Sequence, residues 1–295
     1  MKLCALFALL CSFCLAQSVE FVHLTDTHVM QMEGIHPALV PLRLPNVLSA
    51  AQLEKFLAER RPQPPAFFLH TGDILEAFRY DGESGAVVHG QMERFQALQK
   101  LSPAPMYLAL GNRDVSWYRQ AAGKQVVVRD APMAAEARTA WRGAFECFRN
   151  GTWYSFEQRA GAATYLFAVL DNGVTTDPEF VRAQLAWLRK LLAGARPTAL
   201  VLAMHIPLGD DAFSQAVEEI LRGLARPALV LAGHRHTDGV EEISASPRRV
   251  QVRTASFTGG KSCSRRVVLR PEGIDVYTTN EPDKPVLTIP VGDAR

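Results

Sequence analysis

Seven polar side chains with the chemistry of metal ligands stand directly after apolar runs of this sequence. The runs and their polar ends read FVHLTDTH, AFFLHTGD, MYLALGNRD, ALVLAMH and ALVLAGHRH. Carboxylate, amide and imidazole groups are ligands that proteins offer to divalent metals. The predicted ligands are Asp26, His28, Asp73, Asn112, His205, His234 and His236. If the runs are buried strands, these side chains converge at one sheet edge and form a two-metal site.

Two neighbouring metals imply a particular chemistry. Divalent cations about 3.5 to 4 Å apart repel each other, and a bridging carboxylate offsets the repulsion. Asp73 is the predicted bridge. Such a pair lowers the pKa of a water molecule between the metals, presents hydroxide to phosphorus and neutralises charge that develops on the phosphoryl oxygens. These residues therefore predict hydrolysis of a phosphoric ester without a protein nucleophile.

Strand and helix patterns alternate along the first part of the chain. Apolar runs predict strands at 19–25, 66–71 and 105–110. Apolar residues at spacings of three and four predict helices at 46–60 and 87–101. Because strand and helix alternate, the first three polar ends should follow successive strands of one sheet.

The pattern changes in the middle of the chain. We expect a helix near 133–148, a turn at 150–151 and strands at 152–157 and 163–170. Asp177 is the predicted N-cap of a further helix, and Gly194 is expected just past its end. Two more strand and helix steps then deliver His205 and His234.

The end of the chain completes the predicted fold. Short runs at 249–255, 265–270 and 273–279 predict antiparallel strands that close a second sheet. We find neither a linker nor a repeat, so residues 17–295 should form one α/β domain of two packed sheets with outer helices. The site belongs on the loops that follow the strands.

Composition limits the class of protein and its partners. The 295 residues are 48% hydrophobic and 21% charged, as in an ordinary globular chain. Residues 1–16 predict a signal peptide cleaved after Ala16, so the product should be periplasmic or secreted. Its apolar stretch Leu3–Leu15 is shorter than the ~20 residues of a spanning helix, so no stable membrane anchor is expected. The net charge of +2 is too small to provide a field that favours nucleic acid, and small phosphorylated substrates remain open.

Two cysteines remain after the predicted cleavage. Cys147 and Cys263 can pair in an oxidising compartment, or they can stay as two buried thiols. Their distance in space decides between these alternatives, and sequence leaves both open.

The chain resembles the calcineurin-like metallophosphoesterases, whose motifs are D-x-H, G-D, G-N-H-[DE], a lone H and G-H-x-H. All five blocks occur here in this order. The segments TWYSF, LFAVLDNG and QLAWLRKLLA also resemble parts of the exported and cyclic-nucleotide phosphodiesterase branches. The resemblance implies a four-layer αββα sandwich of two mixed sheets flanked by helices. It also implies two divalent metal ions, drawn from Mn, Fe, Zn or Co.

The resemblance further assigns the ligands to two metals. Asp26, His28 and His236 would hold one ion, while Asn112, His205 and His234 would hold the other and Asp73 would bridge them. Purple acid phosphatases resemble this chain but carry a tyrosine ligand three residues after the bridging aspartate. Here that residue is Glu76, which argues against a ferric tyrosinate.

Arg113 departs from the family pattern, because the family normally has a histidine there that protonates the leaving oxygen. A guanidinium keeps its proton but binds phosphoryl oxygens and stabilises their charge. We therefore expect substrates whose leaving groups depart as stable anions. The alternative is a salt bridge from Arg113 to Asp114 or Glu76 without substrate contact. Asn112 is also expected to touch the phosphoryl group, and Asp114 to support the site.

The sequence thus predicts an exported phosphodiesterase or nucleotide phosphatase. One alternative is a pseudoenzyme that binds metal and phosphate but lost catalysis with the histidine. Another is a protein phosphatase, for which four arginines would form the substrate surface: Arg248, Arg249, Arg265 and Arg266. The remaining histidines are expected in the core or around the ligands at His23 and His70, and in solvent or as acid donors at His36 and His89.

Overall fold

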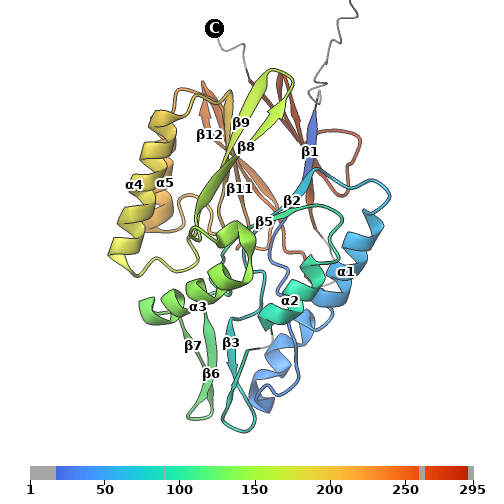
Figure 1. Ribbon diagram of the computed structural model, residues 1–295, viewed down its shortest axis with the longest axis vertical. Helices are drawn as coiled ribbons and strands as arrows, with labels where there is room; N and C mark the ends of the chain where they lie inside the picture. The colour runs from blue at the N-terminus through green and yellow to red at the C-terminus, as the bar shows by residue number, and fades with distance from the viewer. Residues whose placement is uncertain (1–17, 90, 259–262, 292–295) are drawn as a thin grey trace, which may run out of the picture.

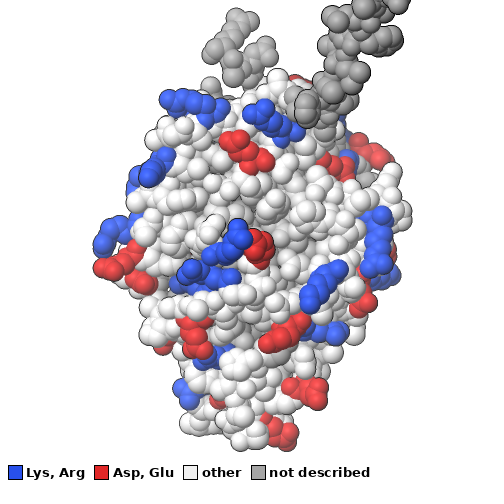
Figure 2. All heavy atoms as spheres, in the orientation of Figure 1, with Lys and Arg blue, Asp and Glu red and all other residues white. Residues whose placement is uncertain are grey.

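The computed structural model describes residues 18–89, 91–258 and 263–291 (Figure 1). The predicted signal peptide, residues 1–16, lies outside this part of the chain. Across the part that is described, no helix is both long enough and apolar enough to cross a membrane. On the face drawn in Figure 2, basic and acidic side chains are interspersed.

Six strands form the first sheet, in the order β16-β15-β14-β1-β2-β5. Their bounds are Val19–Leu24 for β1, Phe67–Thr71 for β2, Met106–Ala109 for β5, Arg265–Arg270 for β14, Gly273–Thr278 for β15 and Leu287–Pro290 for β16. Strands β1, β2 and β5 run parallel to one another. Their carboxyl ends therefore meet at the same edge, as the sequence predicts.

The second sheet also has six strands, in the order β12-β13-β11-β10-β9-β8. Their bounds are Tyr154–Ala160 for β8, Ala163–Val169 for β9, Ala199–Ala203 for β10, Ala228–Ala232 for β11, Gly239–Ala245 for β12 and Arg248–Arg253 for β13. Strands β9, β10, β11 and β13 are parallel. His205 and His234 follow β10 and β11 directly.

The two sheets pack face to face through alternate side chains of their strands. Phe21 and Phe67 of the first sheet stack with ring centroids 4.8 Å apart, and each meets Phe167 of the second sheet edge to face at 5.5 Å. Aromatic pairs in these arrangements stabilise a core beyond the area that they bury. The apolar runs of the sequence are thus buried because the strands have a sheet on one face and helices on the other.

Helices cover both outer faces of the sandwich (Figure 1). The helices α1 (Ser49–Glu59), α2 (Gln91–Gln99) and α3 (Ala131–Ala144) pack on the first sheet. The second sheet carries α4 (Pro178–Gly194) and α5 (Ala212–Arg222). Asp177 caps α4 by accepting from the backbone of Glu179 and Phe180, as predicted, although Gly194 is the last helical residue. The four-layer αββα sandwich is confirmed.

The predicted sheet is wrong for two of the last three strands. The runs at 265–270 and 273–279 form β14 and β15, which are antiparallel as predicted but return to the first sheet beside β1. The run at 249–255 forms β13, which does join the second sheet, antiparallel to β12 and parallel to β11. Strand type follows from local pattern, but the partner depends on which sheet edge is open, and β1 offers the edge not used by β2.

Several local features also differ from the predicted elements. A small third sheet, of order β4-β3-β6-β7, projects at the bottom of Figure 1. Its strands are Arg79–Asp81 for β3, Val87–Val88 for β4, Trp117–Ala121 for β6 and Lys124–Val128 for β7. Helix α1 is preceded by the 3₁₀ segments η1 (Pro37–Leu39) and η2 (Pro41–Asn46), and α3 is followed by η3 (Glu146–Phe148). The predicted helix at 87–101 is shorter because β4 takes its first residues.

The two cysteines are not joined. Cys147 is a free thiol, so the disulfide between it and Cys263 is not realised. Burial raises the pKa of Cys147 to about 11, which keeps this thiol protonated and unreactive at neutral pH.

Candidate metal centre

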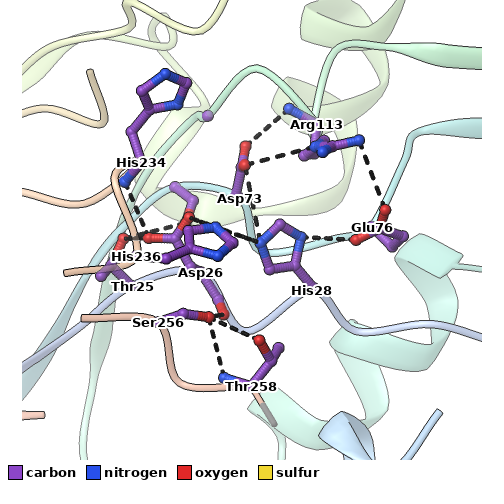
Figure 3. A network of polar contacts seen from close by, with 12 residues as sticks. Thr25, Asp26, His28, Asp73, Glu76, Arg113, His234, His236, Ser256 and Thr258 are labelled. Carbon is purple, nitrogen blue, oxygen red and sulfur yellow. Dashed lines mark hydrogen bonds and ion pairs between the residues drawn. The ribbon is translucent and has the colours of Figure 1, made fainter. Parts of the chain in front are cut away.

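The loops after β1 and β2 remain paired beyond the ends of their strands. The backbone N–H of Asp26 donates to the carbonyl of Gly72 at 2.9 Å, and that of His28 donates to Asp73 at 2.9 Å. The loop after β11 joins them, because the N–H of His234 donates to Asp26 Oδ2 at 3.1 Å. Both sheets therefore contribute to one site at the edge of the sandwich (Figure 3).

The backbone itself is unusual at the predicted ligands. Five of them have positive φ: Asp26 (53°), His28 (44°), Asp73 (49°), His234 (67°) and His236 (55°). Residues with a Cβ seldom occupy this left-handed region, and strain of this kind collects at functional sites. The loops thus turn sharply to aim these side chains inward.

Two glycines allow the loops to approach each other. A Cβ on Gly233 would lie 2.0 Å from Thr25 Oγ1 and 2.4 Å from Asp26 Oδ2. A Cβ on Gly111 would lie 2.2 Å from the backbone nitrogen of Asp73 and 2.3 Å from its Oδ1. Only glycine fits at these two positions.

The first cluster consists of Asp26, His28 and His236. Asp26 Oδ1 lies 3.1 Å from His236 Nε2 and 3.6 Å from His28 Nε2, and the two nitrogens are 3.3 Å apart. Asp26 Oδ2 accepts from Thr25 Oγ1 at 2.7 Å. Asp26 Oδ1 is buried without a hydrogen bond from the residues that the structure describes. A cation at the centre of these three atoms would satisfy it.

The second cluster consists of Asp73, His205 and His234. His205 Nε2 lies 3.3 Å from Asp73 Oδ1 and 3.3 Å from His234 Nδ1. The amide oxygen of the neighbouring motif residue, Asn112 Oδ1, is buried and accepts no hydrogen bond within the described chain. These separations suit atoms that share one ion at about 2.1 Å, so the donor set fits a divalent metal.

Asp73 connects the two clusters. Its Oδ1 faces His205 Nε2, and its Oδ2 lies 3.9 Å from His28 Nε2. Asp73 Oδ1 also accepts from the backbone N–H of Arg113 at 2.8 Å, which fixes the carboxylate plane. A carboxylate with one oxygen toward each cluster has the geometry of a bridge between two cations.

A buried network determines how the His28 ring is oriented. Its Nδ1 lies 2.8 Å from Glu76 Oε2. Glu76 accepts in turn from Arg43 Nη1 at 2.5 Å and from Asn46 Nδ2 at 2.7 Å. With a proton held on Nδ1, Nε2 of His28 is the ring nitrogen left for a metal ion shared with Asp26 and His236.

The His205 ring is oriented by the main chain. Its Nδ1 donates to the carbonyl of Thr71 at 2.8 Å, so Nε2 is left for the second cluster. Asn172 holds the loop in place, because its Oδ1 accepts from the backbone of His205 at 2.9 Å and of Ile206 at 3.1 Å.

Sequence reasoning missed these orienting residues. Glu76 was considered as a departure from a tyrosine and as a salt-bridge partner of Arg113, and Arg43, Asn46 and Asn172 were given no role. The signal for Asn172 was its place directly after an apolar run, at the same kind of position as the ligands. Arg43 and Asn46 lie in a 3₁₀ segment without a recognisable motif, so only the folded chain shows their contacts.

The charges of the centre shift the pKa values of its members strongly in the metal-free chain. Burial lowers the pKa of His28, but Glu76, Asp26 and Asp73 outweigh it and raise the pKa to about 10. Burial likewise lowers the pKa of His205, and Asp73 raises it to about 9. Without metal, both imidazoles therefore hold protons at neutral pH, as expected where negative ligands converge.

Arg113 and Asp114 occupy different surroundings. Both carboxylate oxygens of Asp114 accept backbone N–H groups, from Leu75 and from Gly111, each at 2.8 Å. Burial raises the pKa of Asp114 to about 7. Asp114 thus holds the turn and is not the partner of Arg113. Arg113, with 26% of its side chain exposed, lies 3.6 Å from Glu76 Oε1 through Nη1 and 3.9 Å from Asp73 Oδ2 through Nε.

The other histidines lie where the sequence places them. His23 bonds to Thr71 Oγ1 at 2.8 Å, and His70 bonds to Thr27 Oγ1 at 2.9 Å, both fully buried. Burial lowers their pKa values to about 3, so both are neutral. His36 caps a 3₁₀ turn by accepting from the backbone of Ala38. The exposed ring of His89 packs edge-on against Phe78.

The four arginines considered as a protein-binding surface are occupied by other contacts. Arg249 is buried and donates to the carbonyl of Leu221 at 2.6 Å, among others at the end of α5. Arg265 is buried against Asp238 at 2.6 Å. Arg248 and Arg266 bond to the carbonyl of Thr288 and to Glu20. Two of the four arginines, Arg249 and Arg265, are therefore buried and do not contribute to such a surface.

Comparisons with known proteins agree with this fold. The chain resembles a dimetal phosphatase from Danio rerio, with 14% identity over 92% of this chain and 99% of that chain and a TM-score of 0.62. It also resembles a purple acid phosphatase from yellow lupin, with 13% identity, 91% coverage of this chain and a TM-score of 0.59. The match spans 52% of the lupin enzyme. No curated protein matches the sequence.

The family follows from a separate comparison. The family model for calcineurin-like phosphoesterases matches residues 19–238, which contain all five polar strand ends and both clusters. The match covers well over half of the chain. This protein therefore belongs to the calcineurin-like phosphoesterase family and is a metal-dependent phosphoesterase.

Proposed function

We propose that this chain hydrolyses small phosphodiesters or nucleotides with two divalent metal ions. The observation that carries the proposal is the bridge: Asp73 turns one oxygen toward each of two imidazole clusters. Such a metal pair supplies an activated water and positive charge for the phosphoryl oxygens. The pseudoenzyme alternative is not adopted, because family and fold support a metal-dependent phosphoesterase.

Each residue has a role in this proposal. Asp26, His28 and His236 would hold one ion, and Asp73 would bridge to the other. The second ion would take Asn112, His205 and His234 as its remaining ligands. The orphaned oxygens of Asp26 and Asn112 support this assignment, since a buried oxygen without a donor is costly unless a cation satisfies it.

Arg113 would bind and orient the phosphoryl group. Its guanidinium is partly exposed beside Asp73, where it can donate to a substrate oxygen. Because a guanidinium does not release its proton near neutral pH, Arg113 cannot replace the usual histidine as an acid. Substrates with aryl or phosphoryl leaving groups should therefore react faster than simple alkyl esters.

The test of the proposal is hydrolysis of bis-p-nitrophenyl phosphate and p-nitrophenyl phosphate by the purified protein. Activity is measured after chelation and again with Mn²⁺, Zn²⁺ or Fe²⁺, beside Asp73→Ala and the matched control Asp283→Ala, whose carboxylate is exposed. Turnover that requires metal and disappears in Asp73→Ala alone supports the proposal. Equal activity of wild type and Asp73→Ala would refute it.

The role of Arg113 has a test of its own. Arg113→His restores the residue that the family normally has at this position. We expect a selective gain on alkyl phosphate esters, because an imidazolium can protonate an alkoxide as it leaves. If both aryl and alkyl turnover stay unchanged, this position does not govern leaving-group chemistry.

We also propose that the protein is exported, on the strength of residues 1–16. Expression of the full chain in a Gram-negative bacterium should yield a periplasmic product that begins at Gln17. Intact mass and N-terminal sequencing measure this directly. A cytoplasmic product that retains Met1 would contradict the proposal.

A further inference from the structure

More arginine side chains lie beside the metal centre than are needed to orient its ligands. Arg43 Nη1 and Arg113 Nη1 approach the same oxygen, Glu76 Oε1, at 2.5 and 3.6 Å. Both guanidinium carbons also lie over the ring of Tyr118, at 4.1 and 5.3 Å from its centroid. Arg113 further reaches toward Asp73, so the two guanidiniums extend from the bridging carboxylate outward.

A third arginine lies close by. Arg129 follows β7, whose last residue Val128 pairs with Trp117, so Arg129 comes next to the loop that carries Arg113. Its Nε is buried and finds no hydrogen-bond partner in the described chain. Burial and the charge of Arg113 lower the pKa of Arg129, while Asp73 and Glu76 raise it, as expected for a group within reach of all three.

Two tyrosine hydroxyls add unpartnered donors to this place. Tyr80 and Tyr118 are fully buried and stack with centroids 5.5 Å apart. Neither hydroxyl bonds to another described residue. Tyr80 stacks on the ring over which the guanidinium carbons of Arg43 and Arg113 lie, so both tyrosines pack against these arginines. Buried donors without acceptors point to a ligand rich in oxygen.

The charge balance leads to the same conclusion. The carboxylates of Asp26, Asp73, Glu76 and Asp114 carry at most four negative charges. Two divalent ions alone would balance them. The charges of the three arginines then remain uncompensated, and a cluster of guanidiniums in such a place favours an anion with several oxygens.

We propose that Arg43, Arg113 and Arg129 form a subsite for a second phosphoryl group, so that the preferred substrates are diesters of diphosphate. This inference rests on the proposed function. Water adds to the phosphorus at the metal centre, and the bond from that phosphorus to the bridging oxygen breaks. The departing phosphoryl group keeps the electron pair on that oxygen. The two protons of the water pass to solvent, which gives two phosphate monoesters.

The subsite accounts for the histidine that is missing at position 113. A phosphate leaves as a stable anion and needs no proton from an acid. Charge that develops on it can instead be stabilised by guanidinium groups, which bind phosphate through paired N–H donors. Arginine at this position thus suits a phosphoanhydride better than histidine does.

The experiment compares two thymidylyl substrates that differ in their leaving group: the p-nitrophenyl ester of thymidine 5′-monophosphate, which releases p-nitrophenolate, and dithymidine 5′,5′-diphosphate, which releases a phosphate monoester. We expect a kcat/KM ratio that favours the diphosphate. In Arg129→Gln this ratio should fall about tenfold or more, since a charge-assisted hydrogen bond is worth about 1.5 to 3 kcal/mol. The matched control is Arg119→Gln, an exposed arginine of the same hairpin stacked on Trp117, which should keep the wild-type ratio.

A binding measurement separates this inference from the proposed function. The metal-loaded protein is titrated calorimetrically with pyrophosphate and with phosphate. Tighter binding of pyrophosphate that is lost in Arg129→Gln supports the subsite even if neither nucleotide is hydrolysed. Equal affinities, or a kcat/KM ratio that is the same in Arg129→Gln as in wild type, would overturn the subsite. Loss of turnover in Asp73→Ala would still support the phosphoesterase.

Discussion

The two ligand clusters are built in different ways, although they share Asp73. In the first, His28 is oriented by Glu76, and Glu76 depends on Arg43 and Asn46. In the second, His205 is oriented by a main-chain carbonyl. The clusters also differ in exposure, because the His236 side chain is 47% exposed while His205 is fully buried.

This difference shows which substitutions can change the orientation of the histidine in each cluster. A side-chain network can be weakened or retuned by substitution without touching a ligand, whereas a backbone acceptor persists whatever residue occupies its position. A charged acceptor also makes His28 more basic than a carbonyl would, which strengthens its bond to a metal. Substitutions around the first cluster should therefore change its metal affinity without removing a ligand. The second cluster depends instead on the backbone at the ends of its strands.

The largest expected effects come from the ligands themselves. His28→Ala should leave one metal per chain by removing a ligand of the first cluster, and His205→Ala should do the same for the second. Each variant should lose activity on the order of 10³-fold or more, because about 4 kcal/mol of charge stabilisation is removed. Elemental analysis gives the metal content. Two metals retained in either variant would contradict the assignment.

Glu76→Gln should change the metal affinity of one cluster and not of the other. Removing the charge behind His28 should weaken metal binding at the first cluster about 10- to 100-fold and leave the second unchanged. Metal titration of the metal-free protein measures both affinities. The matched control is Thr71→Val, which keeps the carbonyl that orients His205. Equal weakening at both clusters in Glu76→Gln would remove the distinction between them.

The pH dependence of metal binding should differ between the clusters. Both imidazoles must lose a proton to bind metal. Protons therefore compete with the metal ion below the metal-free pKa values, which are about 10 for His28 and about 9 for His205. Affinity should rise with pH until about pH 9 at the second cluster and about pH 10 at the first. Calorimetry in buffers of different ionisation enthalpy measures the released protons. Binding without proton release at pH 7 would refute this.

The smallest effect is expected for Asn46→Ala. It removes one of two side chains that hold Glu76, while Arg43 remains in place. The metal affinity of the first cluster should fall about threefold to tenfold. One hydrogen bond to a charged group is lost, and water partly replaces it. The same titration as for Glu76→Gln measures it. An effect as large as that of Glu76→Gln would mean that Asn46 alone positions the carboxylate.

The strands and the candidate ligands were predictable because their signals are local. An apolar run such as 199–203 becomes a buried strand in either sheet, and a polar residue directly after it emerges at the sheet edge. This is why His205 was found although it stands alone in its motif. The order of the motifs also indicated the family, which the match over residues 19–238 confirms.

The sequence by itself determined which residue types follow each strand, and thereby the candidate ligand set and the αββα class. Only the tertiary structure decided that β14 and β15 return to the first sheet, that Glu76 supports His28, and that Arg43 and Arg113 both approach Glu76 beside the centre. Those contacts join positions far apart in the chain. They depend on which surfaces remain to be buried after the strands have paired, and no local pattern of residues records that.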